Sequence, residues 1–196
     1  MLTQFFGRYI LLYKYNKWGR AKRLLKATVY IALELAKEGK TAQEIKEYLE
    51  TDTFNSSIYI TVTTLKFLRK GGRITATAAA IGSLLKIKPV LQIQGDKLDA
   101  FAKVITINQA KSKMINAVRK DLDTRFKKYY DNGEMTLAVA HSSYTSEQAN
   151  KFAEELKQEF PKLKINFIDS LPLSIICHTG PDAIAMGIYK TYKNSL

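Results

Sequence analysis

The stretch of sequence that decides the fold is residues 64–98, TLKFLRKGGRITATAAAIGSLLKIKPVLQIQGDKL. Six lysines and arginines, and no acidic residue, come before Asp96 in it. A turn at Gly71-Gly72-Arg73 precedes a run of very small side chains, residues 75–85, and then a strand that begins at Pro89. Because glycine permits sharp turns, this order predicts a cation held at a turn beside a closely packed helix.

Hydrophobic periodicity predicts the elements on either side of this stretch. Helices are expected at residues 27–38, after the capping-box pair Thr41 and Glu44, at 65–70, at 75–85, at 108–128 and after the similar pair Thr145 and Gln148. Strands are expected at residues 57–62, 89–94, 97–101, 135–140, 165–168 and 174–177, with a short helix or strand up to 189. Helices and strands alternate from residue 107 onward, so the predicted class is α/β with a layered architecture.

The longest expected helix begins at Asn108, which we expect to cap it. Its inward face is predicted from four apolar residues at four-residue spacing, Met114, Val118, Leu122 and Phe126. At 196 residues the chain can form one large domain or two small ones. The clearest candidate boundary lies near residues 61–74, where the pattern changes from helical to mixed.

The net charge of +13 raises the expectation of an anionic partner, such as nucleic acid, an anionic membrane or a carboxylate ligand. However, only seven of the 31 basic residues are arginine, the side chain that favours bidentate contacts with phosphates and bases. No zinc-finger spacing, RNP-like motif or basic zipper is present. Lysines on solvated faces are therefore the favoured explanation, and a nucleic-acid partner is disfavoured.

The single cysteine, Cys177, excludes an internal disulfide and a cysteine-based zinc site, and it suits a reducing cytoplasm. No apolar run approaches the roughly 20 residues that span a bilayer. Arg8 and Lys14 interrupt the aromatic N-terminal segment, and no small-residue cleavage site follows it. We therefore expect a cytoplasmic protein.

Arg73 and His178 are the candidate binding residues. Arg73 follows two glycines, and a guanidinium can hold a carboxylate or phosphate with two parallel hydrogen bonds. His178 lies just past an expected strand, so its imidazole, with the Thr179 hydroxyl and nearby backbone N–H groups, suits an anionic ligand. On spacing alone the plainer alternatives are a surface arginine after a helix end and a capping or core histidine.

Two further features carry weaker predictions. His141, before Ser142 and Ser143, raises the possibility of a metal site or a Ser–His pair, but no spaced carboxylates and no nucleophile-elbow motif accompany it. The small-residue helix at 75–85 suits plain helix packing or, more specifically, a wall that leaves room for an acyl chain. We therefore expect no metal and rank an enzymatic role last.

Several separate motifs resemble the DegV family. They are TLKFLRKGGRI, AxxIGSLLKIKPVLQI, GDKL, a long basic helix, AVAHS and ICHTGPDAIAMGIY, in that order over residues 27–189. Members of the family are bacterial two-domain α/β proteins that bind a fatty acid between their domains. Several serve as the fatty-acid-binding subunit of a fatty acid kinase.

The resemblance implies a role for each candidate residue. Arg73, His178 and Thr179 would lie near the carboxylate of a long-chain fatty acid. A wall of the tunnel would be formed by Ile81, Leu84 and Leu85. A fatty acid kinase would phosphorylate the presented carboxyl group to an acyl phosphate for phospholipid synthesis. The chain itself would bind the fatty acid without catalysis, metal or further cofactor.

Residues 1–26 look unlike the family, so we expect most of the N-terminal domain to be lacking. The expected division is a remnant of the N-terminal lipid-binding domain at 1–62 and a C-terminal DegV-like α/β domain at 63–196, with a mixed sheet and flanking helices. Two alternatives stay open: a truncated remnant without ligand binding, and a basic protein that binds nucleic acid or anionic membranes.

Overall fold

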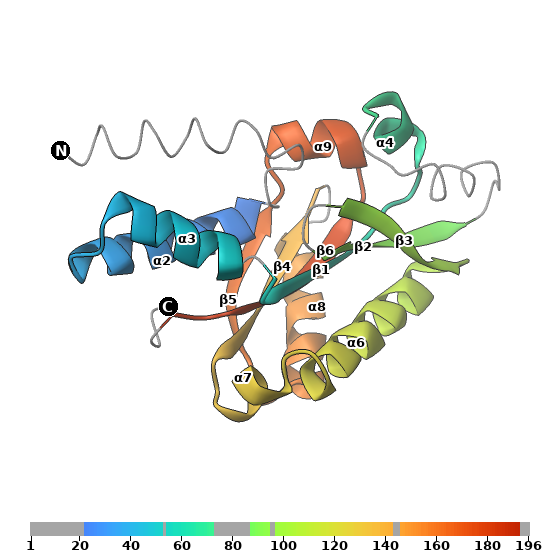
Figure 1. Ribbon diagram of the computed structural model, residues 1–196. Helices are drawn as coiled ribbons and strands as arrows, with labels where there is room; N and C mark the ends of the chain where they lie inside the picture. Colours follow the sequence, from blue (N-terminus) through green and yellow to red (C-terminus); the bar gives the residue numbers. More distant parts are fainter. Residues whose placement is uncertain (1–21, 53, 73–86, 95–96, 143–145, 193–196) are drawn as a thin grey trace.

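The computed structural model describes residues 22–52, 54–72, 87–94, 97–142 and 146–192, and the architecture is built on one six-stranded sheet. The strand order is β3-β2-β1-β6-β4-β5 (Figure 1). Neighbouring strands are antiparallel except β4 and β5, which are parallel, so the sheet is mixed. The predicted α/β class, with a layered mixed sheet and flanking helices, is confirmed.

The strands occupy the segments that are rich in β-branched and apolar residues. Their bounds are β1 Ser56–Thr61, β2 Lys88–Gln94, β3 Lys97–Val104, β4 Met135–His141, β5 Lys164–Ser170 and β6 Ile184–Lys190. The expected hairpin is β2 and β3, with a register shift between Val90 and Leu91. β1 pairs with β2 on one side and β6 on the other, so the sheet contains strands from both sides of residue 62. The division into domains at that residue stays a prediction.

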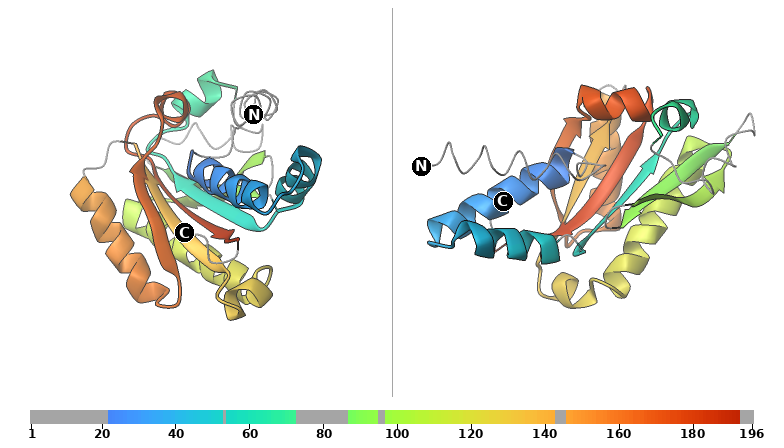
Figure 2. Two further views of the ribbon diagram at one scale, coloured as in Figure 1. Left: turned by 90° about the vertical axis from the view of Figure 1, so that its left-hand side faces the viewer. Right: turned by 45° about the horizontal axis from the view of Figure 1, so that its top comes forward.

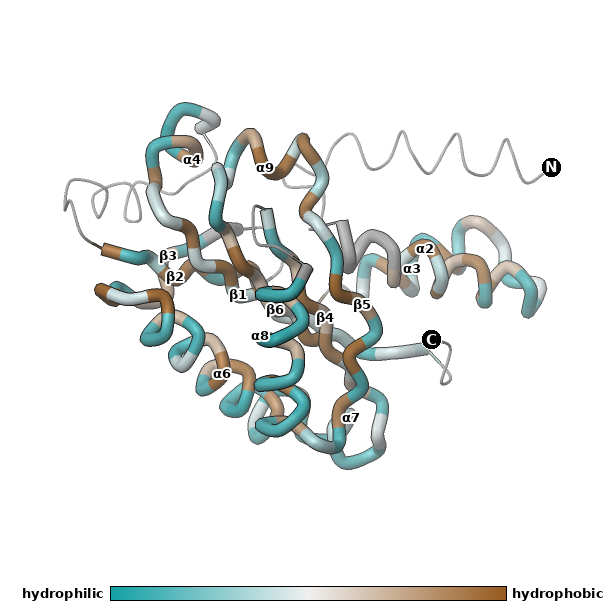
Figure 3. Tube along the Cα trace, turned by 180° about the vertical axis from the view of Figure 1, so that it is seen from behind, coloured by the Kyte–Doolittle hydropathy of each residue, from teal (hydrophilic) through white to brown (hydrophobic). Residues whose placement is uncertain are grey.

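One face of the sheet packs against α6 (Ile107–Asp123) and α8 (Ser146–Glu159). The predicted inward residues of the long helix, Met114, Val118, Leu122 and Phe126, are all buried in this layer. α8 adds Phe152 and Leu156 to the same cluster. Figure 3 shows the matching pattern, with mostly hydrophobic central strands and a largely hydrophilic α8 whose few apolar residues face inward.

The opposite face is covered by three helices, α2 (Lys22–Lys37), α4 (Lys66–Lys70) and α9 (Leu173–Thr179). In the left view of Figure 2 the sheet separates these helices from α6 and α8. Leu68 of α4 and Ile175 and Ile176 of α9 pack on one part of the sheet, and Ala27 of α2 packs on another. The molecule therefore has three layers, with α4 and α9 together at one end.

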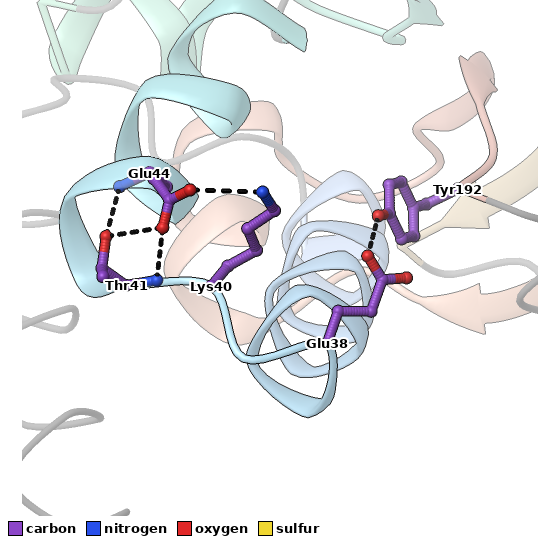
Figure 4. Close-up of polar contacts among 5 residues, drawn as sticks. All are labelled: Glu38, Lys40, Thr41, Glu44 and Tyr192. Atoms are coloured by element: carbon purple, nitrogen blue, oxygen red, sulfur yellow. Dashed lines mark hydrogen bonds and ion pairs between the residues drawn. The ribbon is translucent and has the colours of Figure 1, made fainter.

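α3 (Ala42–Asp52) forms a hairpin with α2 and has its own small core of Ile31, Leu35, Ile45 and Leu49. The predicted capping box at its start is confirmed: the Thr41 backbone N–H donates to Glu44 Oε2 at 2.8 Å, and the Glu44 N–H donates to Thr41 Oγ1 at 3.3 Å (Figure 4). Tyr192, beyond β6, donates its hydroxyl to Glu38 at 2.6 Å and thereby ties the hairpin to the end of the sheet.

Three predictions about elements need correction. Residues 174–177 are helical, within α9, and not a strand. Pro172 is the N-cap of this helix and has an extended conformation. Its carbonyl accepts the first helical hydrogen bonds, from the Ile175 and Ile176 N–H groups. The long helix is capped by Thr106, not by Asn108, since the Thr106 hydroxyl accepts from the Gln109 N–H. It also ends at Asp123, and a second short helix, α7 (Lys127–Asp131), follows.

Two predicted elements lie wholly or partly outside the described residues. They are the small-residue helix at 75–85 and the capping box that begins at Thr145.

Candidate functional site

The candidate site lies at the end of the sheet where β1, β4 and β5 finish and β6 begins. The register places Thr61 and His141 opposite Ile184 on either side of β6, and His141 opposite Ser170. α4 follows β1, and α9 lies between β5 and β6. The two helices therefore meet at this end because the strands that precede them finish together.

The first contact between the helices joins His178 to Gly71. Gly71 is the C-cap of α4, and its N–H donates to the Phe67 carbonyl at 2.9 Å. A Cβ added to Gly71 would overlap His178 Nδ1 and lie 3.0 Å from Cε1. The imidazole thus rests directly on the Gly71 Cα. The HTG motif of α9 and the Gly71-Gly72 turn, which are distant in sequence, form one site.

The second contact runs in the opposite direction, from α4 to the end of α9. Gly180 is the C-cap of α9 and has a φ of 75°, and its N–H donates to the Ile176 carbonyl at 2.7 Å. A Cβ added here would overlap Phe67 Cδ2 and lie 2.7 Å from Cε2. The Phe67 ring therefore lies against the Gly180 Cα. Each helix places an aromatic ring on the glycine that caps the other.

Thr179 is buried between these two contacts, with 4% of its surface exposed. Its hydroxyl donates to the Ile175 carbonyl at 3.2 Å and lies 3.4 Å from the Gly180 carbonyl. These bonds hold the last turn of α9 closed. The hydroxyl proton is therefore already engaged with the backbone of its own helix.

The remaining predicted site residues, Arg73, Ile81, Leu84 and Leu85, lie outside the described residues. For these four the predictions of carboxylate binding and of an acyl-chain wall stay predictions. The described part of the turn ends with Gly72, which has a φ of 60° and would place an added Cβ in open space. Position 72 thus requires glycine because of its positive φ, and position 71 requires it because of the contact with His178.

His141 and His178 belong to opposite layers. Ala140 of β4 packs in the same cluster as Leu68 and Ile176, so strand alternation turns the next residue, His141, toward the α6 and α8 face. The Ser142 hydroxyl accepts from the Ala183 N–H at 2.8 Å, which closes the start of β6. Ser143 lies outside the described residues. Ser142 thus has a structural role that the sequence did not indicate.

Two features of the site were missed by reasoning from the sequence. One is Phe67, whose ring holds Gly180. The other is a row of small side chains on the face of the sheet that the helices cover. Ala140, Ala183 and Ala185 pack in the cluster with α4 and α9, and Ala138 packs in the next, with Ala27 of α2. The alternation of alanine with larger residues in AVAHS and AIAMG is the signal that could have indicated this row.

Two further features of the described residues concern metals and membranes. No group of three His, Cys, Asp or Glu side chains that could hold a metal ion occurs in them. Nor is any of the described helices both long enough and apolar enough to cross a membrane.

The family model described as "Uncharacterised protein, DegV family" matches residues 21–191. The chain belongs to the DegV family. A DegV domain-containing protein of Clostridium perfringens is 35% identical over 159 residues, which cover 81% of this chain and 52% of that protein. The chain spans about half the length of the curated relatives it matches.

Solved structures agree with the assignment to the DegV family. "DegV, a fatty acid binding protein" from Bacillus subtilis is 29% identical with a TM-score of 0.66, covering 82% of this chain and 54% of its own. A stearic acid-binding protein from Eubacterium ventriosum is 21% identical with a TM-score of 0.72, covering 85% of this chain and 55% of its own, and it supports the fold alone.

Proposed function

We propose that the chain binds a long-chain fatty acid at the α4–α9 end of the sheet and presents its carboxyl group to a fatty acid kinase. The observation that carries the proposal is the contact between His178 and Gly71, two residues before Arg73 in the sequence. Since consecutive Cα atoms are 3.8 Å apart, the covalent chain keeps the Arg73 Cα within about 8 Å of the Gly71 Cα. This closeness along the chain supports a site in which an arginine and an imidazole hold one carboxylate.

In this proposal the three polar residues contribute unequally to the carboxylate. Arg73 supplies the charge and two parallel N–H donors that match a carboxylate. His178, which is partly exposed on α9, supplies a further donor. Thr179 is the weakest member, because its hydroxyl proton is already donated to the Ile175 carbonyl.

The acyl chain is proposed to lie beside the α4–α9 end of the sheet, with Ile81, Leu84 and Leu85 as a wall. Each methylene removed from water contributes about 0.8 kcal/mol. A long tail therefore supplies most of the affinity, while the carboxylate contacts set its position. The solved Bacillus subtilis relative, at 29% identity, is described as a fatty acid binding protein, which supports this ligand class.

We assign the phosphoryl transfer to the partner kinase and no catalytic step to this chain. The kinase would convert the presented carboxyl group to an acyl phosphate, which feeds phospholipid synthesis. This part of the proposal rests on the resemblance to binding subunits of fatty acid kinases. It places the protein in the cytoplasm, which suits a chain with a single free thiol, Cys177.

Mass spectrometry of the purified protein under native conditions tests the ligand. The expected result is a co-purifying fatty acid, or saturable binding of added palmitate or oleate. Extraction with organic solvent should release the same lipid from the natively prepared protein. A protein that carries no lipid and binds neither added fatty acid would contradict the proposal.

Arg73→Ala tests the carboxylate contact, with Lys70→Ala as its matched control. Lys70 is an exposed cation at the end of α4 that forms no ion pair with the described residues. A hydrogen bond to a charged group contributes about 1.5–3 kcal/mol, so Arg73→Ala should weaken palmitate binding by about tenfold or more. Lys70→Ala should change it by less than about twofold. Equal losses in the two variants would remove Arg73 from the site.

A further inference from the structure

We propose that Gly71 is a positioning residue for His178. Because Gly71 has no side chain, the imidazole packs directly against its Cα, and this contact is called the seat of the imidazole. The functional consequence rests on the proposed fatty-acid site, whereas the seat itself is a property of the free protein. The first evidence is the close approach described above. An added Cβ at Gly71 would overlap one imidazole atom and lie 3.0 Å from a second.

The backbone at Gly71 does not require glycine. Its φ is −80° and its ψ is −2°, a conformation at the edge of the right-handed helical region that is open to alanine. The Phe67 carbonyl, the other nearby group, would lie 3.4 Å from an added Cβ. The demand for glycine at this position therefore comes mainly from the imidazole of His178.

The other contact between the helices prevents α9 from moving away as a unit. Phe67 lies against Gly180, the last residue of the HTG motif, and Leu68 packs in the same buried cluster as Ile175 and Ile176. The Thr179 hydroxyl also closes the last turn of α9 through the Ile175 carbonyl. A methyl group at Gly71 would consequently move the imidazole about its side-chain bonds, while the backbone of α9 stays in place.

Gly71→Ala should thus separate the position of the imidazole from the stability of the fold. The displaced group is a partly exposed side chain, so the melting temperature should fall by no more than about 2–4 °C, the shift expected for about 1 kcal/mol in a chain of this length. The imidazole would nevertheless lose its contact with residue 71, in the turn that precedes Arg73. The proposed carboxylate would lose the His178 contact although His178 is still present.

The experiment uses the full chain with the variants Gly71→Ala, His178→Ala and their double. Gly133→Ala is the control for lost glycine: its φ is 72° and an added Cβ would meet nothing within 4 Å. The chain contains two histidines, so imidazole resonances in NMR spectra are assigned by His178→Ala, and those of His141 serve as an internal reference. Binding of palmitate is measured on the wild type and on these four variants.

In the free protein we expect a nuclear Overhauser effect between the Gly71 α-protons and the imidazole Hε1 of His178. Gly71→Ala should shift the His178 resonances and leave those of His141 unchanged, and Gly133→Ala should shift neither. Unchanged His178 resonances in Gly71→Ala would overturn the inference, whatever the binding results are.

With palmitate, His178→Ala should weaken binding by about tenfold, the effect of one hydrogen bond to a charged group. Gly71→Ala should weaken binding by at least about threefold, a third of the tenfold loss in His178→Ala. The double variant should bind no more weakly than His178→Ala alone. A double variant whose losses multiply would overturn the positioning role, since Gly71 would then act independently of His178. If the wild-type protein binds no fatty acid, the proposed function is overturned instead. The NMR resonances of His178 then test the contact with Gly71 by themselves.

Discussion

A hydrogen bond between β1 and α6 tests how the sheet holds its helical layer. Tyr59 donates its hydroxyl to Asp121 Oδ2 at 2.7 Å, and the two residues are only 2% and 5% exposed. Arg125 Nη1 lies 3.6 Å from the other carboxylate oxygen of Asp121 and donates to Ser57 Oγ at 2.9 Å. Tyr59→Phe removes the hydroxyl but keeps the ring, which packs edge-on against Phe101 with centroids 5.1 Å apart.

The expected loss follows from the charge and burial of the acceptor. A hydrogen bond to a charged group contributes about 1.5–3 kcal/mol, and a buried acceptor left without its donor adds a desolvation cost. Because Arg125 still faces Asp121, we expect a value near the lower end, about 2 kcal/mol. In a chain of this length that corresponds to a fall in melting temperature of about 4–8 °C. Urea denaturation measures the free energy directly, with an unchanged m-value.

Tyr130→Phe is the matched control. Tyr130 is partly buried, and its hydroxyl forms no hydrogen bond within the described part of the chain. It should lose less than about 0.5 kcal/mol. Combining Tyr59→Phe with Asp121→Ala should cost less than the sum of the single changes, because the two residues share one bond. Equal losses at Tyr59 and Tyr130 would refute the argument.

Two further predictions concern α8 and α3. Phe152→Ala removes a ring that is 0% exposed and should cost about 3–5 kcal/mol in urea denaturation; Phe54, 65% exposed, should tolerate alanine within about 0.5 kcal/mol. The Thr41 N–H and hydroxyl, with Lys40, lower the pKa of Glu44 from 4.5 to about 2. A lowered folded-state pKa adds stability above pH 4.5 that disappears toward pH 2, so the advantage of wild type over Glu44→Gln should shrink across that interval; a constant difference would contradict the capping role.

Most elements of the fold could be predicted because their signals are local. Met114, Val118 and Leu122 recur at helical spacing, and all three are buried against the sheet. The short apolar run at 174–177 was predicted as a strand because a few consecutive apolar residues fit either structure. The segment is a helix because of its place on the sheet. Residues 175, 176 and 179 face inward and residues 173, 174 and 177 face outward, which is a helical spacing imposed by packing on the sheet.

The order of the strands could not be predicted in the same way. β1 lies between β2 and β6, although β6 is the last strand in the sequence. Nothing local in residues 56–61 specifies a partner near residue 187; the pairing follows from which faces must be buried. Ile58 meets one neighbour at Gly187 and the other at Ile93, and this register places the end of β1 beside the start of β6. The position of the candidate site depends on that pairing.

The candidate site shows the same limit more sharply. Read locally, Gly71 and Gly180 are helix-ending glycines, and the sequence explains each by the turn it permits. The structure gives each a second reason: Gly71 accommodates His178, and Gly180 accommodates Phe67. For Gly180 the two reasons add, since its φ of 75° already favours glycine; for Gly71 the ordinary backbone leaves the imidazole as the reason. The two motifs are therefore one structural unit, in which a change to either glycine is felt by the aromatic ring of the other helix.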